Sequence, residues 1–490
     1  MRLEDLMTEG IAPAPGQAPD MLAREIEGLT PDSRHVREGW LFAAIPGTQA
    51  DGARFIPDAL EAGASAILTA EGVSLPRKSY AAHLTCANPR RALALMADRF
   101  FAAQPETVVA VTGTNGKTSV AGFVRQLWEA LGIPAASLGT LGVIASGDAQ
   151  PLPHTTPDAV VLHSLLAGLK ARGFEHLALE ASSHGLEQHR LDGVRVAAAA
   201  FTNLSRDHLD YHADEAAYLA AKLRLFTEVM AADGTAVLNA DTDVFGPVAE
   251  AARARGLTVM DVGRTGTALR LAAQEPSVDG QRLSVETGGK AYEIRLPLVG
   301  AFQASNALLA AGLVIATGAE ARDVLPCLEG LRGAPGRMEQ VARTGNGASV
   351  VVDYAHTPDA LKTVLEALRP HVRGQLAVVF GCGGDRDRGK RPEMGRVAAQ
   401  LADRVIVTDD NPRTEDPAAI RREIMSACPG AREIGGRAAA IEEAITTLKE
   451  GDILVVAGKG HETGQIVGGT VHPFSDADAV RTAAQMSARV

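Results

Sequence analysis

The segment that most constrains this chain is residues 107–119, TVVAVTGTNGKTS, where a strand, a glycine-rich turn and a helix follow one another. The apolar and β-branched run 108–111 is typical of a short buried strand, and residues 119–131 have the composition of a helix. Glycines in such a turn let backbone N–H groups approach an anion, and the helix N-terminus that follows favours negative charge. The segment therefore predicts a phosphate-binding loop.

Two side chains of this loop suit a nucleoside triphosphate. Lys117 can reach the terminal phosphates, and the Thr118 hydroxyl can ligate a magnesium ion. The common form of the pattern has a glycine five positions before Gly116, where this chain has Val111, so the loop is a shortened variant. A glycine turn capping an ordinary strand–helix unit is the alternative, but Lys and Thr follow Gly116 directly. Contacts to the triphosphate are expected from Gly113, Thr114, Asn115, Gly116, Lys117, Thr118 and Ser119.

Length and charge exclude several classes of protein. A chain of 490 residues is expected to form about three domains of roughly 150 residues each. The net charge of −11 argues against non-specific nucleic-acid binding. The four cysteines are scattered, and the first ten residues lack the apolar core of a signal peptide. We therefore expect a soluble, cytoplasmic protein that binds neither nucleic acid nor membrane.

Residues 296–319 carry no charged side chain and are long enough to span a bilayer. Their first half contains Pro297, Gly300, Gln303, Ser305 and Asn306. A strand end, a turn and a buried helix therefore fit this segment better than a membrane span, which is the alternative.

Polar side chains follow two further predicted strands of the central region. The strand His176–Glu180 ends in a carboxylate, well placed to hold a metal beside the phosphate loop, although a helix-capping acid is the alternative. The strand Val196–Phe201 leads into TNLSRDHLDYH, which contains Asn203, Asp207, His208, Asp210 and His212. This density of polar groups beyond a strand end predicts a site. In the amphipathic helix expected over 215–230, Lys222 has by spacing alone the position of an exposed lysine.

The two ends of the chain also alternate strands and helices. In the N-terminal hundred residues we expect strands at 40–45 and 64–69 and a helix at 55–62, with polar loops at 30–34 and 47–52 that are either solvated turns or part of a site. After a glycine- and proline-rich hinge at 333–339, residues 340–490 predict a parallel sheet with helices on both faces. Its strands are expected at Ser349–Asp353, Leu376–Phe380, 404–408 and Ile453–Ala457. Each strand ends in a polar loop, where ligands bind in open α/β sheets.

At this point the sequence resembles the Mur ligases, and within them the members that add the third residue of the peptidoglycan stem peptide. The resemblance covers nearly the whole chain. It is carried by TGTNGKTS (112–119), EASSHGL (180–186), TNLSRDHLDYH (202–212), GRME (336–339), DYAHTPDAL (353–361), GCGGDRDRGKRP (381–392), DDNPRTEDP (409–417) and AGKGHE (457–462). It implies an α/β protein of three domains: a uridine-nucleotide-binding domain (1–104), a central P-loop-type ATPase domain with a mostly parallel sheet (105–335) and a C-terminal Rossmann-like domain (336–490).

The resemblance also implies site residues. Contacts to the UDP sugar and the muramoyl peptide match Ser33, Thr48, Gln49, Ala50, Thr155, Thr156, Ser182, Gln188 and Arg190. His154 departs from the family's pattern, because some relatives have asparagine at this position. The magnesium site matches Thr118, Glu180, His208 and Lys222, the last as a carbamylated lysine that serves as a metal ligand. Lys117, His208 and Lys222 match the catalytic positions, and the base and ribose of ATP match Asn306, Arg337 and Asp353.

The reaction implied is transfer of the γ-phosphoryl group of ATP to a D-glutamyl carboxylate, giving an acyl phosphate and ADP, followed by attack of an amine. The resemblance places Arg386, Asp410, Asn411, Pro412, Arg413, Gly458 and Glu462 in the amino-acid pocket. Physical reasoning favours meso-diaminopimelate over lysine, because Arg413 offers a permanently charged fork for the additional carboxylate and would be left unpaired by lysine. We expect the protein to bind ATP, Mg²⁺ and these small-molecule substrates. We also expect it to be a monomer.

Two other functions are alternatives to this one. A folylpolyglutamate synthetase shares the central and C-terminal domains and the ligation chemistry, but it has no need of the N-terminal domain with its DSR and GTQADG loops. A regulatory nucleotide switch is disfavoured because the N-K-x-D guanine motif is missing and because a switch leaves the charged loops of the third domain unexplained.

Overall fold

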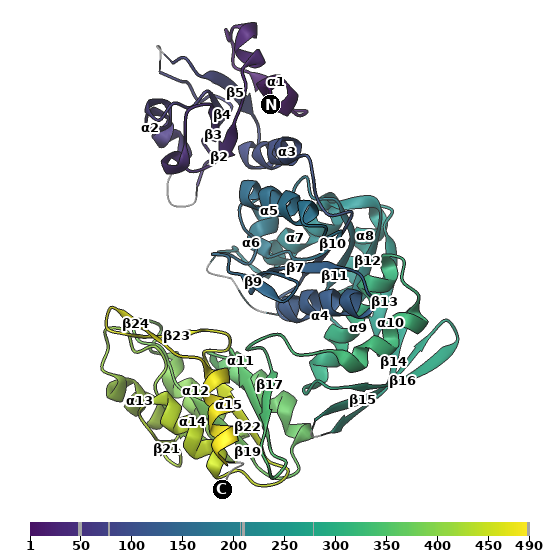
Figure 1. The fold of residues 1–490 in the computed structure, drawn as a ribbon, viewed down its shortest axis with the longest axis vertical. Helices are drawn as coiled ribbons and strands as arrows, with labels where there is room; N and C mark the ends of the chain where they lie inside the picture. The colour runs from purple at the N-terminus through teal and green to yellow at the C-terminus, as the bar shows by residue number, and fades with distance from the viewer. Residues whose placement is uncertain (48–50, 77–78, 206, 208–210, 278, 488–490) are drawn as a thin grey trace. The chain divides into compact units, whose positions relative to one another are not determined.

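The computed structural model describes residues 1–47, 51–76, 79–205, 207, 211–277 and 279–487. The chain divides into two compact units, and Figure 1 shows their helices and strands. The first unit comprises Met1–Asp261 with Gly312–Ala319, and the second comprises Val262–Ala311 with Glu320–Val490. The three domain boundaries given above stay a prediction.

The N-terminal part of the first unit is built on a five-stranded sheet of order β1-β5-β4-β3-β2. Strands β2 to β5 pair in parallel, whereas β1 is antiparallel to β5. The expected strands at 40–45 and 64–69 and the helix at 55–62 are confirmed. The elements are β1 (Ala12–Pro13), β2 (Gly28–Thr30), β3 (Trp40–Ala43), β4 (Ala66–Ala70), β5 (Ala82–Cys86), α1 (Leu3–Leu6), α2 (Ile56–Glu61) and α3 (Pro89–Phe101).

The central sheet of the first unit has the strand order β13-β12-β11-β6-β10-β7-β8-β9. β6 lies between β10 and β11, and the pairings among β7, β10, β6, β11 and β12 are all parallel. The strands are β6 (Thr107–Thr112), β7 (Ala135–Gly139), β8 (Gly142–Ala145), β9 (Asp148–Gln150), β10 (His176–Glu180), β11 (Val196–Phe201), β12 (Met230–Asn239) and β13 (Thr258–Gly263). Because parallel strands end at the same edge, residues 113, 180 and 202 meet there.

The helices that pack with this sheet follow the sequence expectation except at one place. They are α4 (Lys117–Ala130), α5 (Ala159–Ala171), α6 (Ser183–Glu187), α7 (Glu215–Arg224) and α8 (Phe245–Ala254). The α-helix expected over 215–230 ends at Arg224, and a wider π-type turn, Leu225–Val229, leads directly into β12. Leu225 and Phe226 of that turn are fully buried in the central core, so packing of these two side chains takes precedence over regular helix geometry.

The second unit begins with antiparallel hairpins that the sequence analysis did not predict. They consist of β14 (Leu269–Ser277), β15 (Gly280–Thr287) and β16 (Lys290–Leu296). Gly288 and Gly289 both have positive φ, +56° and +74°, the conformation that a tight hairpin turn needs between β15 and β16. After β16 the chain turns into α9 (Ala301–Ala316) and α10 (Ala321–Cys327), which confirms the strand end, turn and helix expected for 296–319. Within the described part of the chain, no helix combines the length and apolarity needed to cross a membrane.

The C-terminal sheet has the order β17-β18-β22-β19-β20-β21. Its strands are β17 (Glu339–Arg343), β18 (Ser349–Asp353), β19 (Leu376–Phe380), β20 (Arg404–Val407), β21 (Arg432–Glu433) and β22 (Ile453–Ala457). The expected parallel sheet is confirmed for its predicted strands, β18, β22, β19 and β20. The sheet also contains β17, which was not predicted and is antiparallel to β18. The connection between them is a tight turn containing Gly347 at φ +92°, too short for a parallel crossover. A separate hairpin, β23 (Gly464–Val467) and β24 (Thr470–Pro473), was also not predicted.

Helices cover both faces of this sheet, as expected (Figure 1). Val351, Val378 and Val455 pack with α11, α12 and α13 on one face, while their strand neighbours Val352 and Val379 pack with α14 and α15 on the other. The helices are α11 (Pro358–Leu368), α12 (Lys390–Leu401), α13 (Pro417–Met425), α14 (Arg437–Thr446) and α15 (Asp476–Ser487). Strands buried on both faces read as continuous apolar runs, which is why they were recognisable in the sequence.

Candidate active site

The phosphate loop of the first unit connects β6 to α4 through two glycines with positive φ, Gly113 at +135° and Gly116 at +90°. A Cβ atom at Gly113 would lie 1.9 Å from the Thr202 hydroxyl, so no other residue fits there. The loop is held against the end of β11, because the Thr114 N–H donates to Asn203 O at 2.8 Å and the Thr202 hydroxyl donates to Asn115 O at 2.6 Å. The loop expected from TGTNGKTS therefore forms at the carboxyl edge of the sheet.

Lys117 and Thr118 lie at the start of α4, where the helix N-terminus favours an anion. The Lys117 Nζ donates to Gly113 O at 2.9 Å and to Thr114 O at 2.8 Å. The Thr118 hydroxyl donates to Glu180 Oε2 at 3.0 Å. The structure thus brings together the residues predicted for the triphosphate and one predicted for the metal.

Glu180 is the last residue of β10 and is held by the turn that follows β7. Its Oε1 accepts from the Thr140 N–H at 2.8 Å, and its Oε2 accepts from the Thr140 hydroxyl at 3.2 Å. Burial raises the pKa of Glu180, and the charge of Lys117 together with these hydrogen bonds offsets part of that rise. The alternative of a helix-capping acid is wrong, because the following helix α6 is capped by the Ser182 side chain. Sequence reasoning missed Thr140, which no motif contains.

Lys222 is buried, and the interpretation of an exposed helix lysine from spacing alone is wrong. Its side chain is 1% exposed on α7, and its Nζ donates to Gly113 O at 2.8 Å and lies 4.2 Å from the centre of the Tyr218 ring. Burial, and secondarily the charge of Lys117, lowers the pKa of Lys222 to about 6. A lysine held largely neutral is nucleophilic, as carbamylation requires.

The oxygen donors at this edge fit a magnesium ion. Among the described residues, no three His, Cys, Asp or Glu side chains are grouped so as to enclose a metal. Magnesium binds proteins through one or two carboxylates, keeping water and substrate phosphates as its other ligands, so Glu180 with the Thr118 hydroxyl is a suitable set. His208 and Asp210 lie outside the described residues, and the predicted role of His208 stays a prediction.

The residues predicted for the muramoyl peptide form one hydrogen-bonded network beside Glu180. The Thr156 hydroxyl donates to the Glu180 carbonyl at 2.8 Å and accepts from the Ser182 hydroxyl at 3.0 Å. Arg190 donates to Thr156 O at 2.6 Å and to Gln188 Oε1 at 2.7 Å. Thr155 shares a hydrogen bond of 3.0 Å with Thr140.

Among the described residues, Ser33 and His154 take no part in the hydrogen bonds of this network. His154 is exposed, and Ser33 opens a short turn of the N-terminal sheet that is capped by Asp32. Thr48, Gln49 and Ala50 lie outside the described residues.

In the second unit, two of the residues predicted for the nucleotide base and ribose lie next to each other. The Arg337 guanidinium lies 4.7 Å from the centre of the Tyr354 ring. The Asp353 carboxylate accepts from the Met338 and Ala355 N–H groups, both at 2.8 Å. Asn306, on α9, donates to Gln303 Oε1 at 2.9 Å.

Loops at the ends of β19, β20 and β22 converge on the predicted amino-acid pocket. Arg413 has a left-handed φ of +51° and donates to Gly384 O at 2.9 Å. Glu462 Oε2 accepts from Asn411 Nδ2 at 3.0 Å and from Lys459 Nζ at 2.9 Å. A Cβ atom at Gly458 would lie 2.7 Å from Asp410 Oδ2, so the loops after β20 and β22 are in close contact.

The other two predicted residues of this pocket come from the same loops. The Pro412 carbonyl would lie 1.9 Å from a Cβ atom at Gly384. Arg386 is exposed and donates to Asp385 O at 3.3 Å.

Comparisons with known proteins decide the family. The models described as "Mur ligase family, catalytic domain", "Mur ligase middle domain" and "Mur ligase, glutamate ligase domain" match residues 25–101, 111–314 and 336–460. A UDP-N-acetylmuramoyl-L-alanyl-D-glutamate–2,6-diaminopimelate ligase of Bradyrhizobium diazoefficiens is 54% identical over 496 residues, which cover 100% of both chains. The chain belongs to the Mur ligase family.

Solved structures agree with this assignment. A UDP-N-acetylmuramoyl-L-alanyl-D-glutamate–2,6-diaminopimelate ligase aligns with a TM-score of 0.76 at 34% identity over 99% of each chain. A Mycobacterium tuberculosis folylpolyglutamate synthase complexed with ADP reaches 0.59 at 20% identity and covers 74% of this chain and 90% of its own, which shows a shared fold alone. The likeness over the full chain favours the Mur ligase over the synthetase considered above.

Two buried cations of this Mur ligase were missed by sequence reasoning. The Lys459 side chain is fully buried and donates to Asn411 Oδ1 at 3.0 Å as well as to Glu462. Arg437 forms a fully buried pair with Asp476 and donates to Asp409 O, beyond the end of β20, and to Ala457 O, at the end of β22. Lys459 lies inside the quoted AGKGHE motif, whereas no motif contains Arg437.

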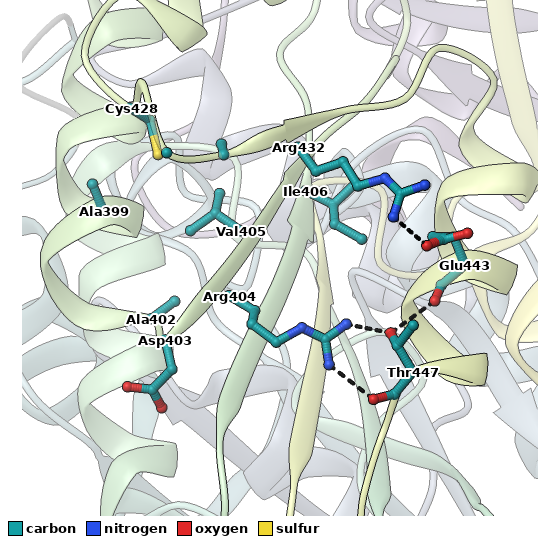
Figure 2. Close-up of a pocket in the computed structure, with 12 residues that line it drawn as sticks. Ala399, Ala402, Asp403, Arg404, Val405, Ile406, Cys428, Arg432, Glu443 and Thr447 are labelled. Atoms are coloured by element: carbon teal, nitrogen blue, oxygen red, sulfur yellow. Dashed lines mark hydrogen bonds and ion pairs between the residues drawn. The ribbon is translucent and has the colours of Figure 1, made fainter.

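A cavity of about 540 Å³ near β20, β21 and α14 is separate from the predicted pocket (Figure 2). Arg404 donates to Thr447 O at 3.1 Å, and Arg432 pairs with Glu443 at 2.5 Å. None of the residues that line the cavity was predicted for a site. Since its arginines are already paired within the protein, we assign no ligand to it.

Proposed function

We propose that this Mur ligase catalyses the ATP-dependent, ADP-forming addition of meso-2,6-diaminopimelate to UDP-N-acetylmuramoyl-L-alanyl-D-glutamate, a step of peptidoglycan precursor synthesis. One structural observation supports the proposal independently of the similarity to named relatives. The side chain of Glu180 bonds to Thr118 of the phosphate loop, while its carbonyl bonds to Thr156 of the muramoyl network. In the proposed reaction, one residue would thus link the phosphoryl-donor side of the site to the acceptor side.

In the first step, a D-glutamyl carboxylate oxygen attacks the γ-phosphorus of ATP, and the bond to ADP breaks. Little covalent chemistry is required of the protein, so positioning and charge neutralisation supply the catalysis. Lys117 and the helix N-terminus behind it would hold the transferred phosphoryl group. Arg190, Gln188, Thr155, Thr156 and Ser182 would hold the muramoyl peptide.

Magnesium would be held by Thr118, Glu180, His208 and Lys222, the last carrying a carbamate. When bound, the ion would neutralise the crowded phosphate oxygens. Formation of the carbamate joins the neutral Lys222 Nζ to CO2 with loss of one proton. It thereby places an anion at the phosphate loop, where the Nζ atoms of Lys222 and Lys117 both bond to Gly113 O.

In the second step, the amine of diaminopimelate attacks the acyl carbon. The C–N bond forms as the C–O bond to phosphate breaks, the amine loses a proton, and phosphate leaves with the bonding electrons. Arg413 would bind the distal carboxylate as a fork, and Glu462 would bind the distal ammonium. Asp410, Asn411, Pro412, Gly458 and Arg386 would complete this pocket.

Other parts of the proposal concern the rest of the molecule. Ser33 with residues 48–50 would contact the uridine nucleotide, and Asn306, Arg337 and Asp353 would hold the base and ribose of ATP. The enzyme would act as a cytoplasmic monomer of three domains, 1–104, 105–335 and 336–490. The net charge of −11 supports small-molecule substrates over nucleic acid.

The acyl phosphate can be tested by isotope transfer. With ¹⁸O in the D-glutamyl carboxylate, ATP, magnesium and diaminopimelate, each phosphate released is expected to carry one labelled oxygen. Unlabelled phosphate with normal product formation would contradict the acyl phosphate. Product formation from a pteroyl-glutamate substrate instead would favour the folylpolyglutamate synthetase.

A further inference from the structure

Helix α6 ends in a backbone motif that usually contains glycine. The Arg190 N–H donates to Gly185 O at 2.8 Å and the His189 N–H donates to Leu186 O at 3.1 Å, the paired bonds of a Schellman turn. His189 occupies its left-handed position with φ +56°. Glycine adopts such a backbone conformation without a steric penalty, whereas the Cβ atom of histidine makes it costly. We therefore expect contacts of the His189 side chain to offset this cost.

The His189 imidazole bridges helix α3 and the loop that follows α6. Its Nε2 lies 2.9 Å from Asn88 Nδ2, and its Nδ1 lies 3.3 Å from Asp192 Oδ1. Asn88 caps α3, with its side-chain oxygen accepting from the Arg91 N–H at 3.1 Å. Since that oxygen is committed, the Asn88 amide group faces His189 as a donor, so Nε2 must accept and Nδ1 must carry the proton toward Asp192.

Asp192 is a fixed anchor for this bridge. Its side chain is 8% exposed and lies 3.2 Å from Arg91 Nε of α3 and 3.3 Å from an Arg224 amino group of α7. Burial raises the pKa of Asp192, but the hydrogen bond from His189 and the charge of Arg224 outweigh it and hold the pKa below its usual value. The carboxylate therefore stays ionised and holds the imidazole in one orientation.

The residues on either side of His189 are both predicted contacts of the muramoyl peptide. Gln188 and Arg190 bond to each other at 2.7 Å, and Arg190 also bonds to Thr156 at 2.6 Å. Their backbones are fixed by the same turn that His189 completes. Any rotation of that turn would move both side chains.

We propose that His189 is a positioning residue for the muramoyl-peptide substrate: by bridging Asn88 and Asp192, it fixes the turn that presents Gln188 and Arg190. This inference rests on the proposed function. It ties substrate affinity to a contact between α3 and the loop after α6, away from the phosphate loop.

The first test separates the side chain from the turn. In His189→Gly the left-handed backbone is retained and the bridge is lost. The KM for UDP-N-acetylmuramoyl-L-alanyl-D-glutamate is expected to rise about tenfold, since a hydrogen-bonded bridge contributes roughly that factor. The KM values for ATP and diaminopimelate, and kcat, should stay within about twofold. Ala102→Gly is the matched control, because Ala102 has φ +53° at the end of α3 and is exposed.

The second test uses a reversal of hydrogen-bond polarity. Asn88→Asp retains a good helix cap but places a carboxylate oxygen against Nε2, so the bridge forms only when His189 is doubly protonated. The charged groups around it, Asp192, Arg91 and Arg224, are unchanged. The ratio of the KM of Asn88→Asp to that of the unmodified enzyme should therefore be larger at high pH than at low pH.

The outcomes distinguish this inference from the proposed function. A His189→Gly enzyme with an unchanged KM for the UDP substrate, or a KM ratio for Asn88→Asp that is flat with pH, would overturn the positioning role. If the unmodified enzyme itself does not turn over the UDP substrate, the proposed function fails first.

Discussion

Lys222 is a buried lysine whose Nζ lies on the phosphate loop near a second lysine, Lys117. A bare ammonium in that place would compete with Lys117 and repel a metal ion. A carbamate there would instead add an oxygen ligand. The same burial that disfavours the ammonium thus favours the reaction with CO2.

Lys222→Ala is expected to lose most ligase activity, because the proposed carbamate ligand is removed. Short-chain carboxylates such as acetate should restore part of it by occupying the vacated space. The measurement is ADP release with and without added carboxylate. Full activity of Lys222→Ala without additive would contradict the role of Lys222.

The pH dependence of stability gives a second test at Lys222. Its pKa in the folded protein, about 6, lies below the ordinary value of 10.5, so the unfolded chain binds more protons between those values. The free energy of unfolding must then rise with pH between those two values. Below the lower value Lys222 is an ammonium in both states, so the whole cost of burying its charge lowers the free energy of unfolding. In CO2-depleted buffer, Lys222→Met should be more stable than the unmodified protein near pH 6, and this gain should shrink by about 1.4 kcal/mol per pH unit above it. A gain independent of pH in urea unfolding would contradict this.

Sequence spacing could not find the burial of Lys222, since a single lysine on an amphipathic helix is ordinarily exposed. It was the resemblance that singled out this position. Thr140 and Arg437 went unnoticed for a related reason: each contacts residues 20 or more positions away in the sequence, and such contacts leave no local pattern.

At the scale of elements, the turn after β7 sets the position of Glu180. A Cβ atom at Gly139 would lie 2.0 Å from Glu180 Oε1 and 2.5 Å from its Cγ. Gly139→Ala must therefore displace the carboxylate. We expect kcat to fall about 100-fold, the effect of a displacement of about 1 Å in a positioned group.

The matched control for that change is Gly122→Ala, inside α4, where a Cβ atom would meet nothing within 4 Å. Alanine favours the helix, so this variant should retain kcat and gain slightly in Tm. If Gly139→Ala is as active as Gly122→Ala, the position of Glu180 is not critical to the reaction.

The buried pair of Arg437 and Asp476 joins the N-termini of α14 and α15 to the loop beyond β20 and to the end of β22. Arg437→Met would leave Asp476 as an unpaired buried charge. The free energy of unfolding should drop by about 3–5 kcal/mol, measured by urea denaturation. The double variant Arg437→Met/Asp476→Leu should recover much of it, whereas an equal loss in both variants would show that the cation itself is needed to hold the loops.

How well each element could be predicted depends on how it is buried. The strands β10, β11, β18, β19 and β22 were predicted with the bounds observed, because strands covered on both faces are uninterrupted apolar runs. The hairpins β14–β16 alternate buried and exposed residues and contain several charges, so they resemble loops in composition. β17 was missed because it lies at a sheet edge with only partly buried side chains.

At the scale of the whole molecule, the α/β class and the family follow from loops at the carboxyl ends of parallel strands in both units. Those loops contain the sequence motifs quoted above. Within each unit, the fold brings the motif-bearing loops of that unit together. In the second unit, Asn411 from the loop after β20 donates to Glu462 from the loop after β22 at 3.0 Å. The assignment of Asn411, Arg413 and Glu462 to an amino-acid pocket stays a prediction.

The most direct test of the account is ADP release with UDP-N-acetylmuramoyl-L-alanyl-D-glutamate, ATP and magnesium, comparing meso-diaminopimelate with L-lysine. Turnover with diaminopimelate, exceeding that with lysine by roughly 10⁴ or more in kcat/KM, is predicted, because lysine would leave Arg413 unpaired. Equal turnover with lysine would contradict the pocket built on Arg413 and Glu462, and no turnover with either amino acid would contradict the proposed reaction.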